Sequence, residues 1–299
     1  MKNATTKGYL FAILSAIIYG CMPLMAKHIY ADGVNPMTLV FLRNFLSLPV
    51  LAILAYRGSK TLKIPLKMLP KISLISLLGC CITPILLFSS YQFMASGTAT
   101  VFHFIYPAVV VISEILFLKN KANAGNIVSV LLCVVGISLF YTPGEPLSIT
   151  GSTLALSSGF TFAAYVVLLS HFDKQGVSGF LFCFYVAAIS SIFTLLACLL
   201  SGSLALPATL TGWGLCILFS LLVTTGAVIL FQQSAFLIGS ERTSILSTLE
   251  PITSIVIGAI VFREVIGPRV IAGSVLVVAA SILIGVADLR RKKQQSPQI

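Results

Sequence analysis

The stretch GYLFAILSAIIYGCMPLMAKHI, residues 8–29, determines the fold class, because it holds 22 residues and a single lysine. An α-helix rises about 1.5 Å per residue, so about 20 apolar residues cross the roughly 30 Å hydrocarbon core of a bilayer. A cleavable signal peptide has a shorter apolar core that ends in a small-residue cleavage site. We therefore interpret residues 8–29 as a retained membrane-spanning helix.

The composition of the whole chain agrees with this interpretation. Hydrophobic residues make up 58% of the 299 residues, charged residues make up 9%, and the mean hydropathy is +1.04. A soluble domain carries about 25% charged residues, so this chain has too little polar surface to cover a water-facing globule. The net charge of +11 does not indicate nucleic-acid binding, because the lysines and arginines lie between apolar runs and at the two ends.

Nine further apolar stretches follow, each long enough to cross a bilayer. Helix is the only state expected for them, since an open strand would leave backbone polar groups unbonded in lipid and barrel strands would alternate polar and apolar residues. The ten predicted spans are 8–29, 36–56, 71–93, 97–118, 123–141, 150–171, 178–201, 211–238, 240–262 and 267–288.

Positive charge near the ends of the spans predicts their orientation. Loops on the cytoplasmic side carry an excess of lysine and arginine. With both termini inside, fifteen of these residues lie on the inner side, three (Lys27, Arg263 and Arg269) lie on the outer side, and Arg43 lies within a span. The predicted location is the cell (plasma) membrane, multi-pass, with cytoplasmic N- and C-termini. Lys27 and Asp32 are expected to be solvated near the first outer loop.

The two halves of the chain repeat weakly. Gly8, Ala12, Ser15 and Tyr19 return as Gly151, Ala155, Ser158 and Phe162, an offset of 143 residues, and Ser96 and Pro107 return as Ser240 and Pro251, an offset of 144. We place the boundary between residues 1–144 and 145–299. Each half has five spans, an odd number, so the second half enters the membrane inverted. Inverted repeats are typical of transporters whose substrate site lies between the halves near the midplane.

Taken in order, these features resemble the drug/metabolite transporter superfamily, specifically the ten-span EamA-type transporters. The features that match are a Gly-rich first helix in each half, Arg43 in the second span, Pro107 and Glu250-Pro251 in the fourth span of each half, and Phe262-Arg263-Glu264 before an apolar final helix. The resemblance implies an all-α integral membrane protein of ten transmembrane helices in two inverted five-helix repeats. It also implies a secondary transporter, an exporter of small metabolites such as amino acids, that works by alternating access around a central cavity.

Ionisable side chains inside spans are costly in lipid, so they are the first candidates for the substrate and proton pathway. Glu250, in the ninth span, could carry a proton because burial disfavours its charged form, or it could bond a neighbouring helix. Arg43, in the second span, could bind a substrate carboxylate through two parallel hydrogen bonds, or it could pair with a helix end. Pro107 and Pro251 are expected to bend the fourth and ninth spans.

Further candidates lie on the same spans and their neighbours. His103 and Glu114 share one face of the fourth span at about 16 Å along the axis. His103 is either a pathway residue that titrates near neutral pH or a bonded core histidine, whereas Glu114 is expected to reach the inner interface. The remaining candidates, which either line the cavity or tie helices together, are Tyr19, Tyr106, Gln92, Gln233 and Ser247.

Two other classes of function stay open, an intramembrane enzyme and a non-transporting membrane receptor or assembly subunit. An enzyme needs clustered catalytic groups, but the chain has only eight acidic residues and no HExxH or GxSxG motif. We expect no metal and no cofactor, because the three histidines are far apart and the seven cysteines lie inside apolar runs without metal-ligand spacing. The expected partners are a small-molecule substrate, a proton as the candidate coupled ion, and the lipid bilayer, and either a monomer or a homodimer fits.

Overall fold

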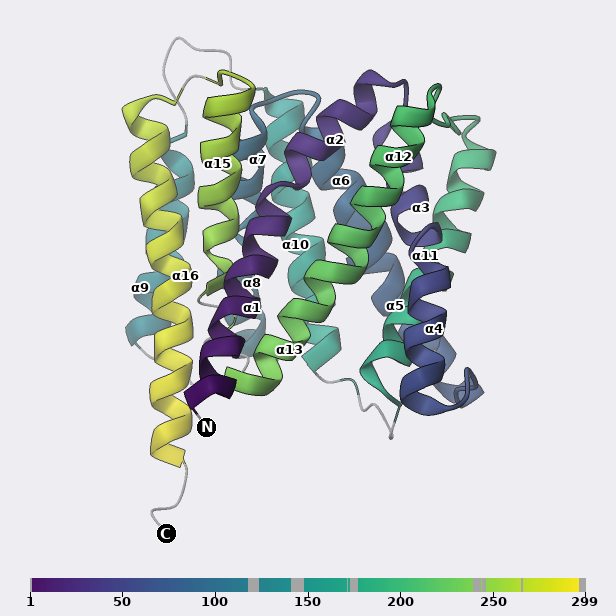
Figure 1. Cartoon of the computed structure of the whole chain (residues 1–299). Helices are drawn as coiled ribbons and strands as arrows, with labels where there is room; N and C mark the ends of the chain where they lie inside the picture. The colour runs from purple at the N-terminus through teal and green to yellow at the C-terminus, as the bar shows by residue number, and fades with distance from the viewer. Residues whose placement is uncertain are drawn as a thin grey trace.

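The computed structural model describes the backbone of residues 2–117, 124–140, 148–170, 172, 177–238, 243, 246–264 and 266–295. Within these ranges every regular element is a helix, and no strand occurs (Figure 1). The α-helices are α1 (Lys2–Gly20), α2 (Met22–Ala31), α3 (Pro36–Phe45), α4 (Leu48–Ser59), α5 (Leu69–Ser76), α6 (Thr83–Ser90), α7 (Ser96–His103), α8 (Tyr106–Phe117), α9 (Ala124–Ser138), α10 (Ile149–Ser170), α11 (Gly179–Leu200), α12 (Leu210–Phe219), α13 (Val228–Ile238), α15 (Leu249–Val261) and α16 (Pro268–Gln295). A 3₁₀ turn, η1 (Leu66–Met68), and two π-helices, η2 (Leu77–Ile82) and η3 (Ser220–Ala227), complete the set.

The prediction of an all-helical membrane protein is confirmed for the described part of the chain. Seven helical stretches are long and apolar enough to cross a membrane, namely Thr5–Ala31, Pro36–Ser59, Leu66–Ser90, Ser96–Ser113, Ile149–Leu169, Gly179–Leu200 and Leu210–Phe231. Shorter apolar helices, Ile127–Ser138, Leu249–Val261 and Pro268–Leu283, fall within the three remaining predicted spans. Large apolar side chains face outward, with Leu210 91% and Ile149 81% exposed, a pattern that suits contact with lipid.

The helices form one bundle with two distinguishable ends. The N-terminal end of α1 and the C-terminal end of α16 lie at the same end, which we call the proximal end (Figure 1). The opposite, distal end carries α2, the start of α7 and the connection between α15 and α16 (Figure 1).

Three of the first four predicted spans are broken within their length. The first breaks at Cys21 between α1 and α2, the second at Leu46-Ser47 between α3 and α4, and the fourth at Phe104-Ile105 between α7 and α8. A proline follows each break within three residues. Proline lacks a backbone N–H and clashes with the preceding turn, which explains why a helix ends just before it. Backbone hydrogen bonds continue across each of these positions, so each span stays one helical stretch with a local distortion beside a proline.

The two π-helices occupy corresponding places in the two halves. η2 lies between α5 and α6, η3 lies between α12 and α13, and their first residues, Leu77 and Ser220, are 143 residues apart. This offset equals that of the repeated residues in the first span of each half. A π-helix is a local widening of an α-helix that occurs frequently at functional sites. The same distortion at the same offset is independent structural support for an internal repeat.

The first helix of each half packs against the other half. The helix α1 packs on α13 of the other half, and α10 packs on α6, as Figure 1 shows for α1 and α13. A methyl group at Gly8 would lie 2.9 Å from Leu237 Cβ, and one at Gly151 would lie 3.1 Å from Phe93 Cβ. These contacts correspond under the repeat, because Gly8 and Gly151 are 143 residues apart and Phe93 and Leu237 are 144 apart.

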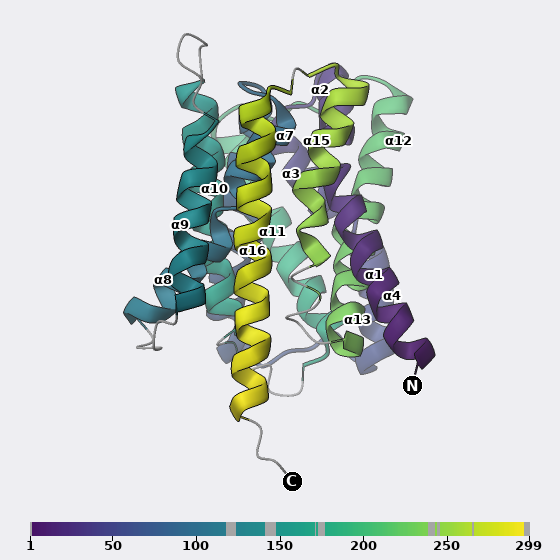
Figure 2. The ribbon, with the colours of Figure 1, turned by 90° about the vertical axis from the view of Figure 1, so that its left-hand side faces the viewer.

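The helices α9 and α16, far apart in sequence, form a closely packed pair at one side of the bundle. Figure 1 and Figure 2 both show them side by side. A methyl group at Gly136 would lie 2.9 Å from the carbonyl oxygen of Gly273, and one at Gly273 would lie 2.7 Å from the ring of Phe140. Small residues let helix backbones approach closely in lipid, where packing drives association.

We expect Gly273→Ala to destabilise the protein by about 1–3 kcal/mol, since the added methyl group overpacks the α9–α16 contact. The measurement is the thermal unfolding temperature of the purified protein in detergent. Gly214→Ala in α12 is the matched control, because nothing lies within 4 Å of its added carbon and alanine favours helix. An unfolding temperature for Gly273→Ala at or above that of Gly214→Ala would contradict the proposed close contact.

Candidate functional site

Four of the residues selected from the sequence lie together in the middle of the bundle. Tyr19 of α1 is within electrostatic range of both Arg43 of α3 and Glu250 of α15, and Tyr106 of α8 is within range of Glu250. The structure adds Tyr91, which follows α6 and lies within electrostatic range of both Arg43 and Glu250. These five residues form the central cluster, to which both halves of the chain contribute.

Arg43 has no ionic partner among the described residues. Its Nε atom is buried without a hydrogen-bond acceptor, and its guanidinium carbon lies 5.7 Å from the centroid of the Phe88 ring. The alternative raised from the sequence, that Arg43 pairs with a helix end or a carboxylate, finds no support in the described part of the chain. A buried donor without an acceptor is energetically costly. An anion that accepts a hydrogen bond from this guanidinium would remove that cost.

The backbone around Arg43 is held by both π-helices. Ser220, the first residue of η3, donates its hydroxyl to the Arg43 carbonyl at 2.7 Å. Asn44 donates its side-chain amide to the Cys80 carbonyl of η2 at 3.3 Å and to the Val40 carbonyl at 2.8 Å. Ser220 and Asn44 are buried. The end of α3 is therefore fixed from two sides, while Nε of Arg43 has no hydrogen-bond partner among the described residues.

Glu250 is the second residue of α15, and its carboxylate receives no hydrogen bond and no ion pair from the described residues. In the first turn of a helix, the unpaired backbone amides favour negative charge. The end of α1 lies directly against this turn. A methyl group at Gly20 would lie 2.9 Å from the Glu250 carbonyl oxygen, and Ser254 donates its hydroxyl to the Gly20 carbonyl at 3.1 Å.

His103 is only 6% exposed and is bonded across the two halves. Its Nδ1 atom lies 2.8 Å from the hydroxyl oxygen of Ser158, and that hydroxyl donates to the Ala155 carbonyl at 2.6 Å. Because the Ser158 proton is already donated to Ala155, His103 carries a proton on Nδ1 and donates it to Ser158. This geometry agrees with the bonded core histidine that the sequence left open.

An aromatic wall connects His103 to the central cluster. The ring centroids are 5.7 Å apart between His103 and Tyr106, 4.8 Å between Tyr106 and Phe162, and 5.3 Å between Phe162 and Tyr165. Tyr165 packs on η2 at Gly79, where a methyl group would overlap its ring. Such offset or edge-to-face contacts stabilise a rigid surface. The wall gives one side of the central cluster a fixed shape.

The other sequence-selected residues lie outside the central cluster or cannot be placed. Gln92 is exposed in the turn after α6, and Gln233 is half-buried in α13. Ser247 is half-buried and donates its hydroxyl to the Thr243 carbonyl at 3.0 Å. Pro107 and Pro251 lie in the first turns of α8 and α15. The side chain of Glu114 lies outside the described residues.

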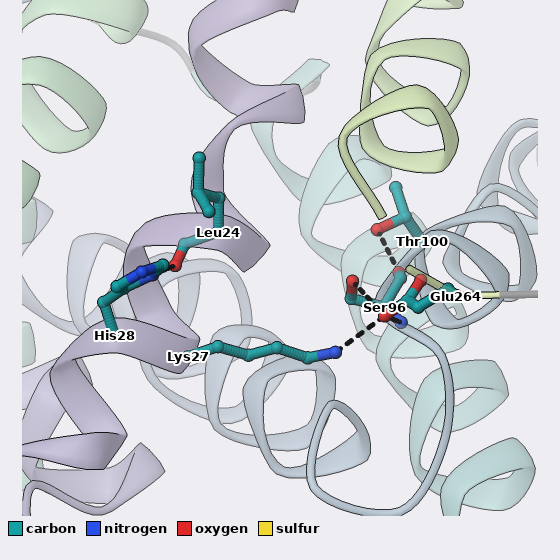
Figure 3. A network of polar contacts seen from close by, with 6 residues as sticks. All are labelled: Leu24, Lys27, His28, Ser96, Thr100 and Glu264. Carbon is teal, nitrogen blue, oxygen red and sulfur yellow. Dashed lines mark hydrogen bonds and ion pairs between the residues drawn. The ribbon is translucent and has the colours of Figure 1, made fainter. Parts of the chain in front are cut away.

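A second polar network lies at the distal end (Figure 3). Glu264 Oε1 accepts from Lys27 Nζ at 2.7 Å, from the Ser96 backbone amide at 3.2 Å and from the Ser96 hydroxyl at 3.1 Å. The side chains of Lys27 and Glu264 are 24% and 14% exposed. The expectation that Lys27 is simply solvated was wrong, since its ionic partner lies 237 residues away in the chain.

Asp32 also has a partner that the sequence did not reveal. It accepts from the Thr209 amide at 3.1 Å and from the Thr209 hydroxyl at 2.8 Å. These hydrogen bonds hold the pKa of Asp32 below its ordinary value. The expectation that Asp32 is merely solvated is therefore corrected, because it fastens the start of α12 to the turn after α2.

Comparisons with known proteins identify the family. The sequence profile of the EamA-like transporter family matches residues 6–142 and again residues 149–286. The uncharacterized inner membrane transporter YicL of Salmonella typhimurium is 24% identical over 313 residues, which covers 97% of this chain and 99% of the relative. An uncharacterized transporter of Haemophilus influenzae is 23% identical over 188 residues, covering 59% of this chain and 61% of the relative.

A solved structure agrees with the fold. The protein in that crystal structure is 14% identical, superposes with a TM-score of 0.63, and is matched over 97% of this chain and 99% of its own. This likeness concerns the fold alone. The family matches cover nearly the whole chain, one in each half, so the chain belongs to the EamA-like transporter family and is a membrane transporter, not an enzyme.

Proposed function

We propose that the protein is a secondary transporter of the inner membrane that exports small zwitterionic metabolites, amino acids among them, by alternating access around a central cavity between the two repeats. The observation that carries the proposal is the central cluster. It holds one basic and one acidic side chain, Arg43 and Glu250, neither of which has an ionic partner among the described residues. An unpaired buried charge is costly, and a ligand with a carboxylate and an ammonium group would satisfy both at once.

The proposed architecture is ten crossings in two inverted five-helix repeats, residues 1–144 and 145–299, with both termini in the cytoplasm. The matching π-helices and the packing of α1 and α10, each against the other half, support the repeat. The shared position of the N-terminal end of α1 and the C-terminal end of α16 supports an even number of crossings (Figure 1). Exposed basic residues in the connection between α4 and α5, such as Lys60 and Lys63, lie at this proximal end, as the positive-inside rule requires of the cytoplasmic side.

In the proposed complex, the substrate carboxylate lies against the Arg43 guanidinium, whose planar array of N–H groups matches two carboxylate oxygens. The substrate ammonium lies near Glu250. Tyr19, Tyr91 and Tyr106, each close enough to Glu250 to be influenced by its charge, would contact the remainder of the substrate.

Glu250 also provides a route for coupling to protons. Its carboxylate binds either the substrate ammonium or a proton, but not both at once. When the site faces one side of the membrane, a proton displaces the substrate, and when it faces the other, substrate displaces the proton. This competition exchanges one proton for one substrate, and bending at the proline-linked distortions of the first, second and fourth spans would let the site change sides.

We expect Arg43→Gln to weaken binding of substrates that carry a carboxylate by about 10- to 100-fold, because hydrogen bonds to a charged group contribute about 1.5–3 kcal/mol. The measurement is uptake into proteoliposomes of an amino acid and of the corresponding amide, which lacks the carboxylate. The amide should lose little affinity in the variant. Arg57→Gln, an exposed arginine at the end of α4, is the matched control. Equal loss for the acid and the amide would exclude a carboxylate role for Arg43.

We expect Glu250→Gln to abolish the response of transport to a pH gradient, since an amide cannot exchange protons in the physiological range. Efflux from proteoliposomes is measured with and without an imposed gradient, and the wild type should be accelerated by it several-fold. The amount of folded protein recovered in the vesicles serves as the control for insertion and folding. A variant that still responds to the gradient would remove Glu250 from the coupling step.

We expect Ser220→Ala to raise the apparent KM for carboxylate substrates by about two- to tenfold with little change in maximal rate. The lost hydrogen bond, of about 0.5–1.5 kcal/mol, is the one that fixes the Arg43 backbone. Ser220→Thr keeps a hydroxyl and should restore the wild-type KM. Ser138→Ala in α9 is the control, because its exposed hydroxyl bonds only within its own helix. A KM that shifts equally for the amide would point to a general packing defect.

A further inference from the structure

Glu264 connects three separate segments at the distal end (Figure 3). Its carboxylate binds Lys27 of α2 and both the amide and the hydroxyl of Ser96, the first residue of α7. Its own backbone amide donates to the Gly258 carbonyl of α15 at 3.0 Å. One side chain thus ties α2 and α7, both from the first half, to the connection between α15 and α16 in the second half.

The bond to Ser96 replaces a missing helix cap. The N-cap position of α7 is Ala95, which has no side-chain acceptor for the amides of the first turn. A carboxylate at the start of a helix supplies that acceptor and also interacts favourably with the helix dipole. The start of α7 is therefore stabilised by a residue from the other half, and it loses this cap if the two separate.

The segment that carries Glu264 is closely fitted to its neighbours. Lys27 Nζ lies 4.3 Å from the centroid of the Phe262 ring, and the Phe262 amide donates to the Gly258 carbonyl at 3.1 Å. A methyl group at Gly258 would overlap Glu264 Oε2. Any residue larger than glycine at position 258 would therefore displace the Glu264 carboxylate. Glu264 also lines, together with Gly97 and Thr98, a cavity of about 10 Å³ that has room for no more than about one water molecule.

Two of the segments joined by Glu264 lie beyond a local distortion of their span. The distortion at Cys21 lies between α1 and α2, and the one at Phe104-Ile105 lies between α7 and α8. Helices kink beside proline, and a proline follows both positions, so these are the points at which the distal parts of the first and fourth spans would tilt. Glu264 holds both parts against the second half.

We propose that the interactions of Glu264 with Lys27 and Ser96 form a latch that holds the distal end of the transport path closed. Opening this end separates α2 and α7 from the α15–α16 connection, breaks the ion pair and removes the cap of α7. The inference rests on the protein being a transporter, but it needs neither the proposed substrate nor the proposed proton coupling.

The test uses Thr98→Cys, in the cavity that Glu264 also lines, as a reporter of distal opening. A membrane-impermeant maleimide is applied to each side of sealed vesicles in turn, and labelling of the parent chain gives the background from the native cysteines. Adding Glu264→Gln or Lys27→Gln should raise the labelling rate from one side by about fivefold or more, equivalent to about 1 kcal/mol. The double variant should label no faster than the quicker single variant, because both changes break one interaction.

A second test variant and one control separate a latch from a general loosening of the distal end. Lys27→Gln leaves the cap of α7 in place, so it keeps the proposal testable if Glu264→Gln fails to fold. Asp32→Asn weakens another contact between the halves at the same end, with Thr209, that does not touch α7, and it should leave labelling unchanged. Labelling of Lys27→Gln at the wild-type rate, or equal acceleration by Asp32→Asn, would overturn the proposal. Labelling requires no substrate, so a failure of the proposed substrate would not affect this result.

Discussion

A backbone carbonyl released by a break in a helix must find a donor inside the protein, because lipid offers none. In this structure the donor is repeatedly a buried serine from the other half of the chain. Ser15 donates to Ala227 of η3, Ser220 donates to Arg43, and Ser254 donates to Gly20. The interrupted helices thus depend on contact between the two repeats, and this requirement places the irregular backbone along the interface where they meet.

The chemistry of the central cluster follows from the same constraint. The bonds from Ser220 and Asn44 satisfy the backbone at the end of α3 and in η2, so the guanidinium of Arg43 is not needed for that purpose. The close approach of α1 to α15 at Gly20 brings Glu250 within range of Tyr19. The main-chain groups there have internal partners, whereas the two charged side chains have no ionic partner among the described residues. That difference is the basis for proposing a ligand site here.

The central cluster could be predicted in part because a charge within an apolar span is conspicuous. Arg43 and Glu250 stand out for this reason, and Tyr19 and Tyr106 lie on the repeat face or beside a proline. Tyr91, Asn44 and Ser220 could not be selected, because tyrosine, asparagine and serine are ordinary residues in such spans and only their neighbours give them a role. Gln92 looked equivalent to the others, yet it is exposed in a turn. The partner of Lys27 was hidden by a separation of 237 residues.

The sequence by itself determined the membrane environment, the helical class and the internal repeat. These depend on the length of apolar runs and on a fixed offset, both of which are read along the chain without knowledge of its neighbours in space. Only the tertiary structure decided that α1 and α10 each pack against the other half, that Arg43 and Glu250 both lie within electrostatic range of Tyr19, and that Glu264 binds Lys27. Hydropathy specifies which residues enter lipid, but many helix arrangements bury the same residues. Close glycine contacts and side-chain bonds between distant segments select one of them.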